Sequence, residues 1–200
     1  MVDLLEKIGL GKLNNALIYG VVIALVLAIL SRGLALDYGW WAFLFRWLHV
    51  LSGVMWIGIL WYFNFVQIPT MPQIPNELKP AVSKHIAPAA LFWFRWAALS
   101  TVITGLILAH MNGYLFDALM LNKLAPGKNL AIGIGMWLGL IMAYNVWMII
   151  WPNQQKALGL VDATAEEKAA AAKVAMLTSR FNTMFSVPML YFMVAAQNIF

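Results

Sequence analysis

The stretch that decides the fold is LFRWLHVLSGVMWIGILWYFNFVQIP (44–69). A transmembrane helix needs about 20 mostly apolar residues, and this stretch is long and apolar enough to be one. It carries one histidine, His49, with Arg46 three residues before it and Gly53 four residues after it. This spacing places the three residues on one face of a helix. Because an ionisable residue inside a span indicates a functional site, the first question is whether His49 binds a ligand or only packs.

The composition is that of an integral membrane protein. The chain has 200 residues, of which 63% are hydrophobic and 10% charged, whereas about a quarter of the residues of a soluble domain are charged. The net charge of +5 comes from single cations near the ends of apolar runs, so we assign it to membrane topology and expect no nucleic-acid partner. There is no cysteine, which excludes disulfides, iron–sulfur clusters, thiolate zinc sites and a covalently attached c-type haem.

The apolar runs predict an all-α, polytopic membrane helix bundle with about five transmembrane helices in a single integral membrane domain, residues 1–200. We expect residues 1–14 to form an amphipathic surface helix. The predicted spans are 16–36, 42–66, 88–111, 130–151 and 178–199.

Two connecting segments have features of their own. Four prolines follow the second span, at 69, 72, 75 and 80, and they predict a stiff, extended loop because proline does not continue a helix. Residues 164–177 are rich in alanine and are predicted to form a surface helix that runs into the fifth span. Thr164 and Glu167 have the spacing of a capping box at its start.

The distribution of Lys and Arg predicts the orientation. Five spans place the two termini on opposite sides of the membrane. More cations fall on the side of the N-terminus, where we place Lys7, Lys12, Lys79, Lys84, Lys156, Lys168, Lys173 and Arg180. The other side holds Arg32, Arg46, Lys123 and Lys128. The positive-inside rule therefore predicts a bacterial inner-membrane protein with a cytoplasmic N-terminus and a periplasmic C-terminus.

The predicted topology places His49 and His110 at similar depths near the outer surface, on adjacent spans. Two such histidines are what a bis-histidine haem b requires. Gly53 leaves room for a flat macrocycle on the face of His49, Arg46 is placed to pair with a haem propionate, and Trp56 and Leu60 continue the same stripe. The alternatives are a packed imidazole at His49, an interfacial histidine at His110 and glycines that serve helix packing. His85, in the loop before the third span, is a weaker candidate.

A second group of polar residues lies near the cytoplasmic ends of the spans. An arginine two turns inside a span is costly unless it is paired, and Arg95 has this position. We expect Asn64 and Asn145 to satisfy it, or an anionic ligand such as the propionates of a second haem. The alternative is a structural polar cluster that fixes helix register. Its members are Arg95, Asn64, Asn145, Arg180 and Asn182. The predicted spans contain no carboxylate, which argues against a proton-driven transporter and a carboxylate-based hydrolase.

Four strings resemble the N-terminal membrane domain of the bacterial cytochrome-c-type urate oxidases. They are LHVLSGVMWIGILWYFNFVQIP (48–69), LFWFRWAALSTVITGLIL (91–108), MAYNVWMIIWPNQQKAL (142–158) and SRFNTMFSVPMLYFMV (179–194). The resemblance covers roughly residues 43–194. More distantly, the chain resembles the HemJ-type protoporphyrinogen oxidases, which are small haem-b membrane proteins.

The resemblance implies a haem b whose iron is bound by the histidine of the second span, which is His49 here. Members of the urate oxidase family carry a C-terminal cytochrome c domain, which needs cysteines that this sequence lacks. We therefore expect electrons to pass to a separate cytochrome or complex. No residue matches a urate site, so the resemblance does not carry the urate activity over.

Three functions remain in view at this point. The first is a haem-b-binding membrane redox protein that passes electrons to a separate partner, and the residues leave open whether it is a membrane oxidoreductase in its own right. The second is a non-catalytic accessory subunit that stabilises a larger membrane complex through lipid and other subunits. The third is a permease that binds an anion at Arg95, which a five-helix chain without internal repeats makes less favourable.

Overall fold

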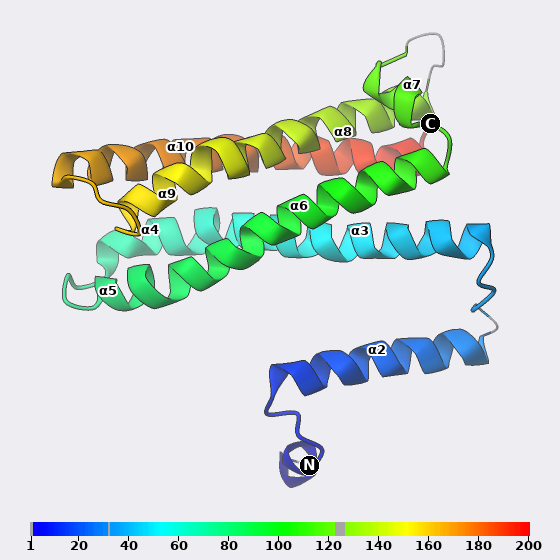
Figure 1. The fold of residues 1–200 in the computed structure, drawn as a ribbon, viewed down its shortest axis with the longest axis horizontal. Coiled ribbons are helices and arrows are strands. Elements are labelled where there is room, and N and C mark those ends of the chain that lie inside the picture. Colours follow the sequence, from blue (N-terminus) through cyan, green and yellow to red (C-terminus); the bar gives the residue numbers. More distant parts are fainter. Residues whose placement is uncertain (1, 32, 123–126) are drawn as a thin grey trace. The chain divides into compact units, whose positions relative to one another are not determined.

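The computed structural model describes residues 2–31, 33–122 and 127–200, so Arg32 and Lys123 of the charge argument lie outside the described residues. Throughout the described residues the regular structure is helical, which confirms the all-α prediction. The chain forms two compact units, residues 1–43 and residues 44–200. The ribbon of Figure 1 shows their helices.

The first unit begins with α1 (Val2–Lys7) and α2 (Leu13–Leu30). α1 is shorter than the surface helix that the sequence predicts over residues 1–14, because Gly9 takes a left-handed conformation with φ +75° and starts a turn. Two side chains fasten this turn to α2. The hydroxyl of Tyr19 donates to the carbonyl of Ile8 over 2.6 Å, and Nδ2 of Asn15 donates to the carbonyl of Gly9 over 2.9 Å.

The second unit is a bundle of long helices joined by short ones. Its first long helix is α3 (Tyr38–Trp61), which begins in the first unit and continues as η1 (Tyr62–Gln67), α4 (Ile68–Thr70) and η2 (Met71–Gln73). The second consists of α5 (Lys79–Ala81), η3 (Val82–Ile86) and α6 (Ala87–Met111). After α7 (Leu115–Leu119), the third consists of α8 (Lys128–Tyr144), η4 (Asn145–Ile150) and α9 (Trp151–Ala157), and α10 (Ala165–Asn198) is the last.

Within the described residues, four helices are long and apolar enough to cross a membrane, which supports a multi-pass membrane protein. They are Leu13–Leu30, Tyr38–Gln73, Lys79–Met111 and Lys128–Ala157. The predicted fifth span, 178–199, is not among these four, because residues such as Asn182, Gln197 and Asn198 lower its hydropathy. It forms the second half of α10, a single helix of 34 residues. The predicted capping box is confirmed at the start of α10, where Thr164 and Glu167 exchange two hydrogen bonds.

Three π-helical segments allow the spanning helices to contain prolines. The segments η1, η3 and η4 are each followed by a proline in the first turn of the next helical segment, namely Pro69, Pro88 and Pro152. Proline lacks an N–H and its ring clashes with the carbonyl four residues back in an α-helix. The wider π turn accommodates both effects, so the helix runs through each of these prolines without a break. The prediction of an extended loop from residue 69 is therefore wrong, since the helix continues to Gln73.

The core lies where the second half of α3 meets the other helices. Its fully buried side chains include Trp56, Leu60, Phe94 and Met142. α10 packs along α8 and α9 (Figure 1). It is joined to the end of α3 by a hydrogen bond from Trp61 Nε1 to Ser186 Oγ, over 2.9 Å. These contacts fix the end of the candidate site at which Trp56 and Trp61 lie.

Candidate functional site

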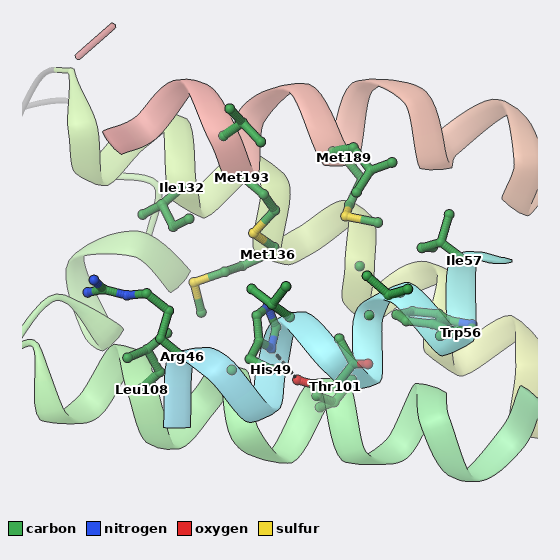
Figure 2. Close-up of a pocket in the computed structure, with 18 of the residues that line it drawn as sticks. Arg46, His49, Trp56, Ile57, Thr101, Leu108, Ile132, Met136, Met189 and Met193 are labelled. Atoms are coloured by element: carbon green, nitrogen blue, oxygen red, sulfur yellow. Dashed lines mark hydrogen bonds between the residues drawn. The ribbon is translucent and has the colours of Figure 1, made fainter. Parts of the chain in front are cut away.

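A cavity of about 660 Å³ lies between α3, α6, α8 and α10, and its volume is in the range usual for ligand pockets. Most of its lining is apolar. The residues that α3 and α6 contribute include Arg46, His49, Gly53, Trp56, Gly58, Trp61, Thr101 and Gly105. The opposite wall includes Ile132, Met136, Gly139, Leu140, Met189, Leu190, Met193 and Val194. Four of the five predicted cofactor-binding residues line the cavity, namely Arg46, His49, Gly53 and Trp56. Figure 2 shows how Arg46, His49 and Trp56 lie.

His49 is held in the cavity by a hydrogen bond between two helices. Its Nδ1 lies 2.8 Å from the backbone carbonyl oxygen of Thr101 on α6. A carbonyl oxygen only accepts, so Nδ1 carries the proton and donates. In the neutral imidazole, the proton on Nδ1 leaves Nε2 with a free lone pair. A metal-binding histidine in proteins characteristically has this arrangement, with one nitrogen donating to a carbonyl and the other facing the metal.

The close approach of His49 to α6 depends on Gly105. A Cβ atom added at this glycine would lie 2.7 Å from Cε1 and 2.9 Å from Nδ1 of His49. Any side chain at position 105 would therefore displace the imidazole. Two other glycines of the lining, Gly58 and Gly139, have nothing within 4 Å of an added Cβ. They are therefore not needed for a close contact between helices, and their lack of a side chain keeps the cavity open.

One end of the cavity is polar. Arg46 lies at the end away from Trp56 in Figure 2, and Tyr114, Gln197 and Asn198 line the cavity with it. Burial raises the pKa of the Tyr114 phenol, and the nearby Arg46 cation offsets part of this rise. A ligand that fits this cavity has an apolar body and a polar or anionic end.

The structure does not bring the two predicted histidine ligands together. His110 is exposed at the end of α6 and is not one of the residues that line the cavity. It follows Gly105 by five residues, which is about 140° around a helix, so it projects from a different face. His85 is also exposed. Leu60 is buried in the core and does not line the cavity, whereas Trp56 does.

Several lining residues have no signal in the sequence. Thr101 and Gly105 form the His49 contact, but only the pairing of α3 with α6 reveals this. Met136, Met189 and Met193 line the wall opposite His49. In the sequence they resemble ordinary helix-packing residues, which methionine usually is.

The predicted cluster around Arg95 is divided in two, and the prediction that Asn64 and Asn145 satisfy Arg95 is wrong. Nδ2 of Asn145 donates to Oδ1 of Asn182 over 2.8 Å. Asn64 donates to the hydroxyl of Ser179 over 2.7 Å. Both asparagines thus face α10 and join helices to it, which favours the structural alternative for them.

Arg95 itself takes a different partner. Its guanidinium carbon lies 3.3 Å from the centroid of the Trp151 ring, in a cation–π contact. Its Nη1 is buried and makes no hydrogen bond within the described part of the chain. Arg180 is exposed on α10, so the structure places it apart from the buried asparagines.

Residues 113–198 match the family model described as urate oxidase N-terminal. This part of the chain is a urate oxidase N-terminal-like domain, which confirms the resemblance over residues 113–198. The match contains the strings at 142–158 and 179–194, whereas the strings at 48–69 and 91–108 and His49 lie outside it. The comparisons found no matching curated protein and no matching solved structure.

The urate oxidase N-terminal-like domain supplies one wall of the cavity. The matched residues include Tyr114, α7, α8 and α10, and α8 and α10 carry the three methionines. α3 and α6, which hold His49, provide the facing wall. The cavity therefore lies between the matched domain and the helices that precede it.

Proposed function

We propose that this protein binds haem b in the cavity and works as a membrane redox protein that passes electrons to a separate partner. The observation that carries the proposal is the 2.8 Å contact between Nδ1 of His49 and the carbonyl oxygen of Thr101. In this contact Nδ1 donates to the carbonyl, which leaves Nε2 free to bind iron.

The residues of the cavity fit a haem in three respects. The donor set contains an imidazole nitrogen, which is the commonest protein ligand of haem iron. Gly58 and Gly139 leave open space for a flat macrocycle where any larger side chain would intrude. The apolar walls would bury the ring, and Arg46 at the polar end is placed to pair with a propionate.

When bound, a haem supplies reversible one-electron redox chemistry. The protein's own residues provide its setting. Thr101 fixes the tautomer and the orientation of His49, and Gly105 allows the imidazole to reach α6. The buried indole of Trp56 and the aliphatic walls exclude water, which is one way in which a protein tunes a redox potential.

The experiment that tests the proposal is the haem content of the purified protein, produced with haem available and measured as the pyridine haemochrome. We expect stoichiometric haem b in the wild type and its loss in His49→Ala. His110→Ala is the matched control, because His110 is exposed and does not line the cavity, and it should keep its haem. A colourless wild type, or a His49→Ala protein with full haem content, would overturn the proposal.

We also propose the orientation that the charges favour, with the N-terminus in the cytoplasm of a bacterium. Because the sequence has no cysteine, single cysteines introduced at Glu77 and Phe116 report the two ends of the helix Lys79–Met111 without background. A membrane-impermeant maleimide should label Phe116→Cys in intact cells and Glu77→Cys only after permeabilisation. The reverse pattern would refute this orientation.

A second candidate function is that of an accessory subunit in a larger membrane complex, and α2 favours it. α2 is long and apolar enough to cross a membrane, and its own unit buries none of its residues, which favours contacts with lipid or with another subunit. Co-purification in mild detergent tests this role. A defined partner that is lost when α2 is replaced by a polyleucine helix would support it, and a protein that purifies alone from native membranes would count against it.

A further inference from the structure

The wall opposite His49 carries thioether sulfur atoms as its ligand-capable groups. The lining residues of α8 and the inner part of α10 are apolar apart from their methionines: Met136 from α8, and Met189 and Met193 from α10. Figure 2 shows the three sulfurs turned into the cavity, on the side facing α3 and His49. Gln197, one helical turn beyond Met193 on α10, also lines the cavity.

Two of the methionines lie towards the part of the cavity that contains His49. Met136 and Met193 both pack against a small hydrophobic cluster, which consists of Ala118, Ala131, Ile132 and Ala196. The side chain of Met193 also lies against Gly135, where an added Cβ would be 3.4 Å from its sulfur. Met189 is one helical turn deeper than Met193, towards Trp56 in Figure 2.

We propose that the second axial ligand of the haem is a thioether of the pair Met136 and Met193, opposite His49. This inference rests on the proposed function. It replaces the bis-histidine arrangement with a histidine–methionine one, because His110 does not line the cavity while the two sulfurs do. Thioether sulfur is a soft ligand that binds haem iron together with histidine and raises its reduction potential relative to two histidines.

The physical setting favours this ligand. A thioether is uncharged and weakly polar, so it resides in an apolar wall without the desolvation cost of an unpaired amide or charge. Methionine has three rotatable bonds, which let the sulfur adjust its position to the iron. A site with a histidine held firmly by a backbone carbonyl and a flexible methionine opposite combines one fixed and one adaptable ligand.

The test uses Met136→Leu, Met193→Leu and the double variant. Met184→Leu is the matched control, because Met184 is an exposed residue of α10 that does not line the cavity. Leucine preserves volume, so the fold should tolerate each change. At equal haem content, the wild type should be low-spin and six-coordinate, show the far-red charge-transfer band of ferric iron bound by a thioether, and resist carbon monoxide in the ferrous state. Loss of the ligating sulfur should abolish the band, give high-spin iron and open the ferrous site to carbon monoxide, whereas Met184→Leu should behave as the wild type.

The outcomes separate this inference from the proposed function. Loss of the band in either single variant, or only in the double variant, supports a thioether of this pair. A haem-bearing protein that needs His49 but whose spectrum is unchanged in the double variant overturns the inference and leaves the proposed function standing. A wild type without haem overturns both.

Discussion

The substitution Gly105→Ala tests the construction of the site most sharply. The new Cβ would lie 2.7 Å from Cε1 of His49, which is closer than two carbon atoms can pack, and the nearest atoms belong to a ring rather than to a flexible chain end. The imidazole must therefore move, and its 2.8 Å hydrogen bond to the Thr101 carbonyl is lost.

The expected cost follows from three contributions. Inserting a methyl group into a packed contact costs about 1–3 kcal/mol. Leaving a partly buried donor without its partner costs about 1–3 kcal/mol. Replacing glycine by alanine inside a helix returns about 0.5–1 kcal/mol. The net destabilisation is about 1–5 kcal/mol, which corresponds to a fall of at least about 2 °C in Tm for a chain of this size.

The assay is thermal or denaturant unfolding in detergent, with haem content measured on the same samples. Gly58→Ala and Gly139→Ala are matched controls for stability, because an added Cβ at either position meets nothing within 4 Å. They should be as stable as the wild type or slightly more stable, and haem content is compared with the wild type. If Gly105→Ala matches these controls in stability and the wild type in haem content, the contact between His49 and α6 does not have the role assigned to it.

Three further predictions concern other parts of the second unit. Asn182→Ala removes the partner of Asn145 and a donor to a backbone carbonyl; denaturation in detergent should show a loss of about 1–3 kcal/mol, and unchanged stability would refute the role of this network. Thr164→Ala should lower the hydrogen-exchange protection of the first turn of α10 by about 1 kcal/mol. The hydrogen bonds from Thr164 lower the pKa of the Glu167 carboxyl from its ordinary value of 4.5. The stabilisation that this carboxylate gives to the start of α10 is therefore present above pH 4.5 and is lost as the pH falls through the lowered pKa. Hydrogen-exchange protection of the first turn that does not change with pH would contradict this. Arg46→Gln should raise the pKa of Tyr114, because the cation favours the phenolate; the ultraviolet titration, corrected with Tyr114→Phe, should shift to higher pH, and a shift to lower pH would contradict the assignment.

The sequence predicts the helices well because their signal is strong and local. Long apolar runs identify four spans, and the spacing of Thr164 and Glu167 predicts the start of α10. The course of the chain at Pro69 could not be predicted, because a π turn before a proline depends on how the whole helix packs. The polar residues in the second half of α10 lower its hydropathy because some of them, such as Asn182, serve contacts with α8.

The candidate site could be predicted on one helix but not across helices. The spacing of Arg46, His49 and Gly53 is local, and all three line the cavity. The partners of His49 on α6 and the sulfurs of α8 and α10 depend on which helices are neighbours and on their rotation. Similar depth alone predicts His110 as the second haem ligand. His110 follows Gly105 by five residues, about 140° around the helix, so its side chain projects from a different face.

The binding of haem iron by Nε2 of His49 is the central claim, and imidazole rescue of His49→Gly tests it most directly. The glycine removes the ligand and leaves a space of its shape beside the Thr101 carbonyl. We expect the purified variant to lack the Soret and α bands of the wild type, and haem supplied together with imidazole to restore them. A purified His49→Gly protein that keeps the full wild-type spectrum without added imidazole would contradict the account.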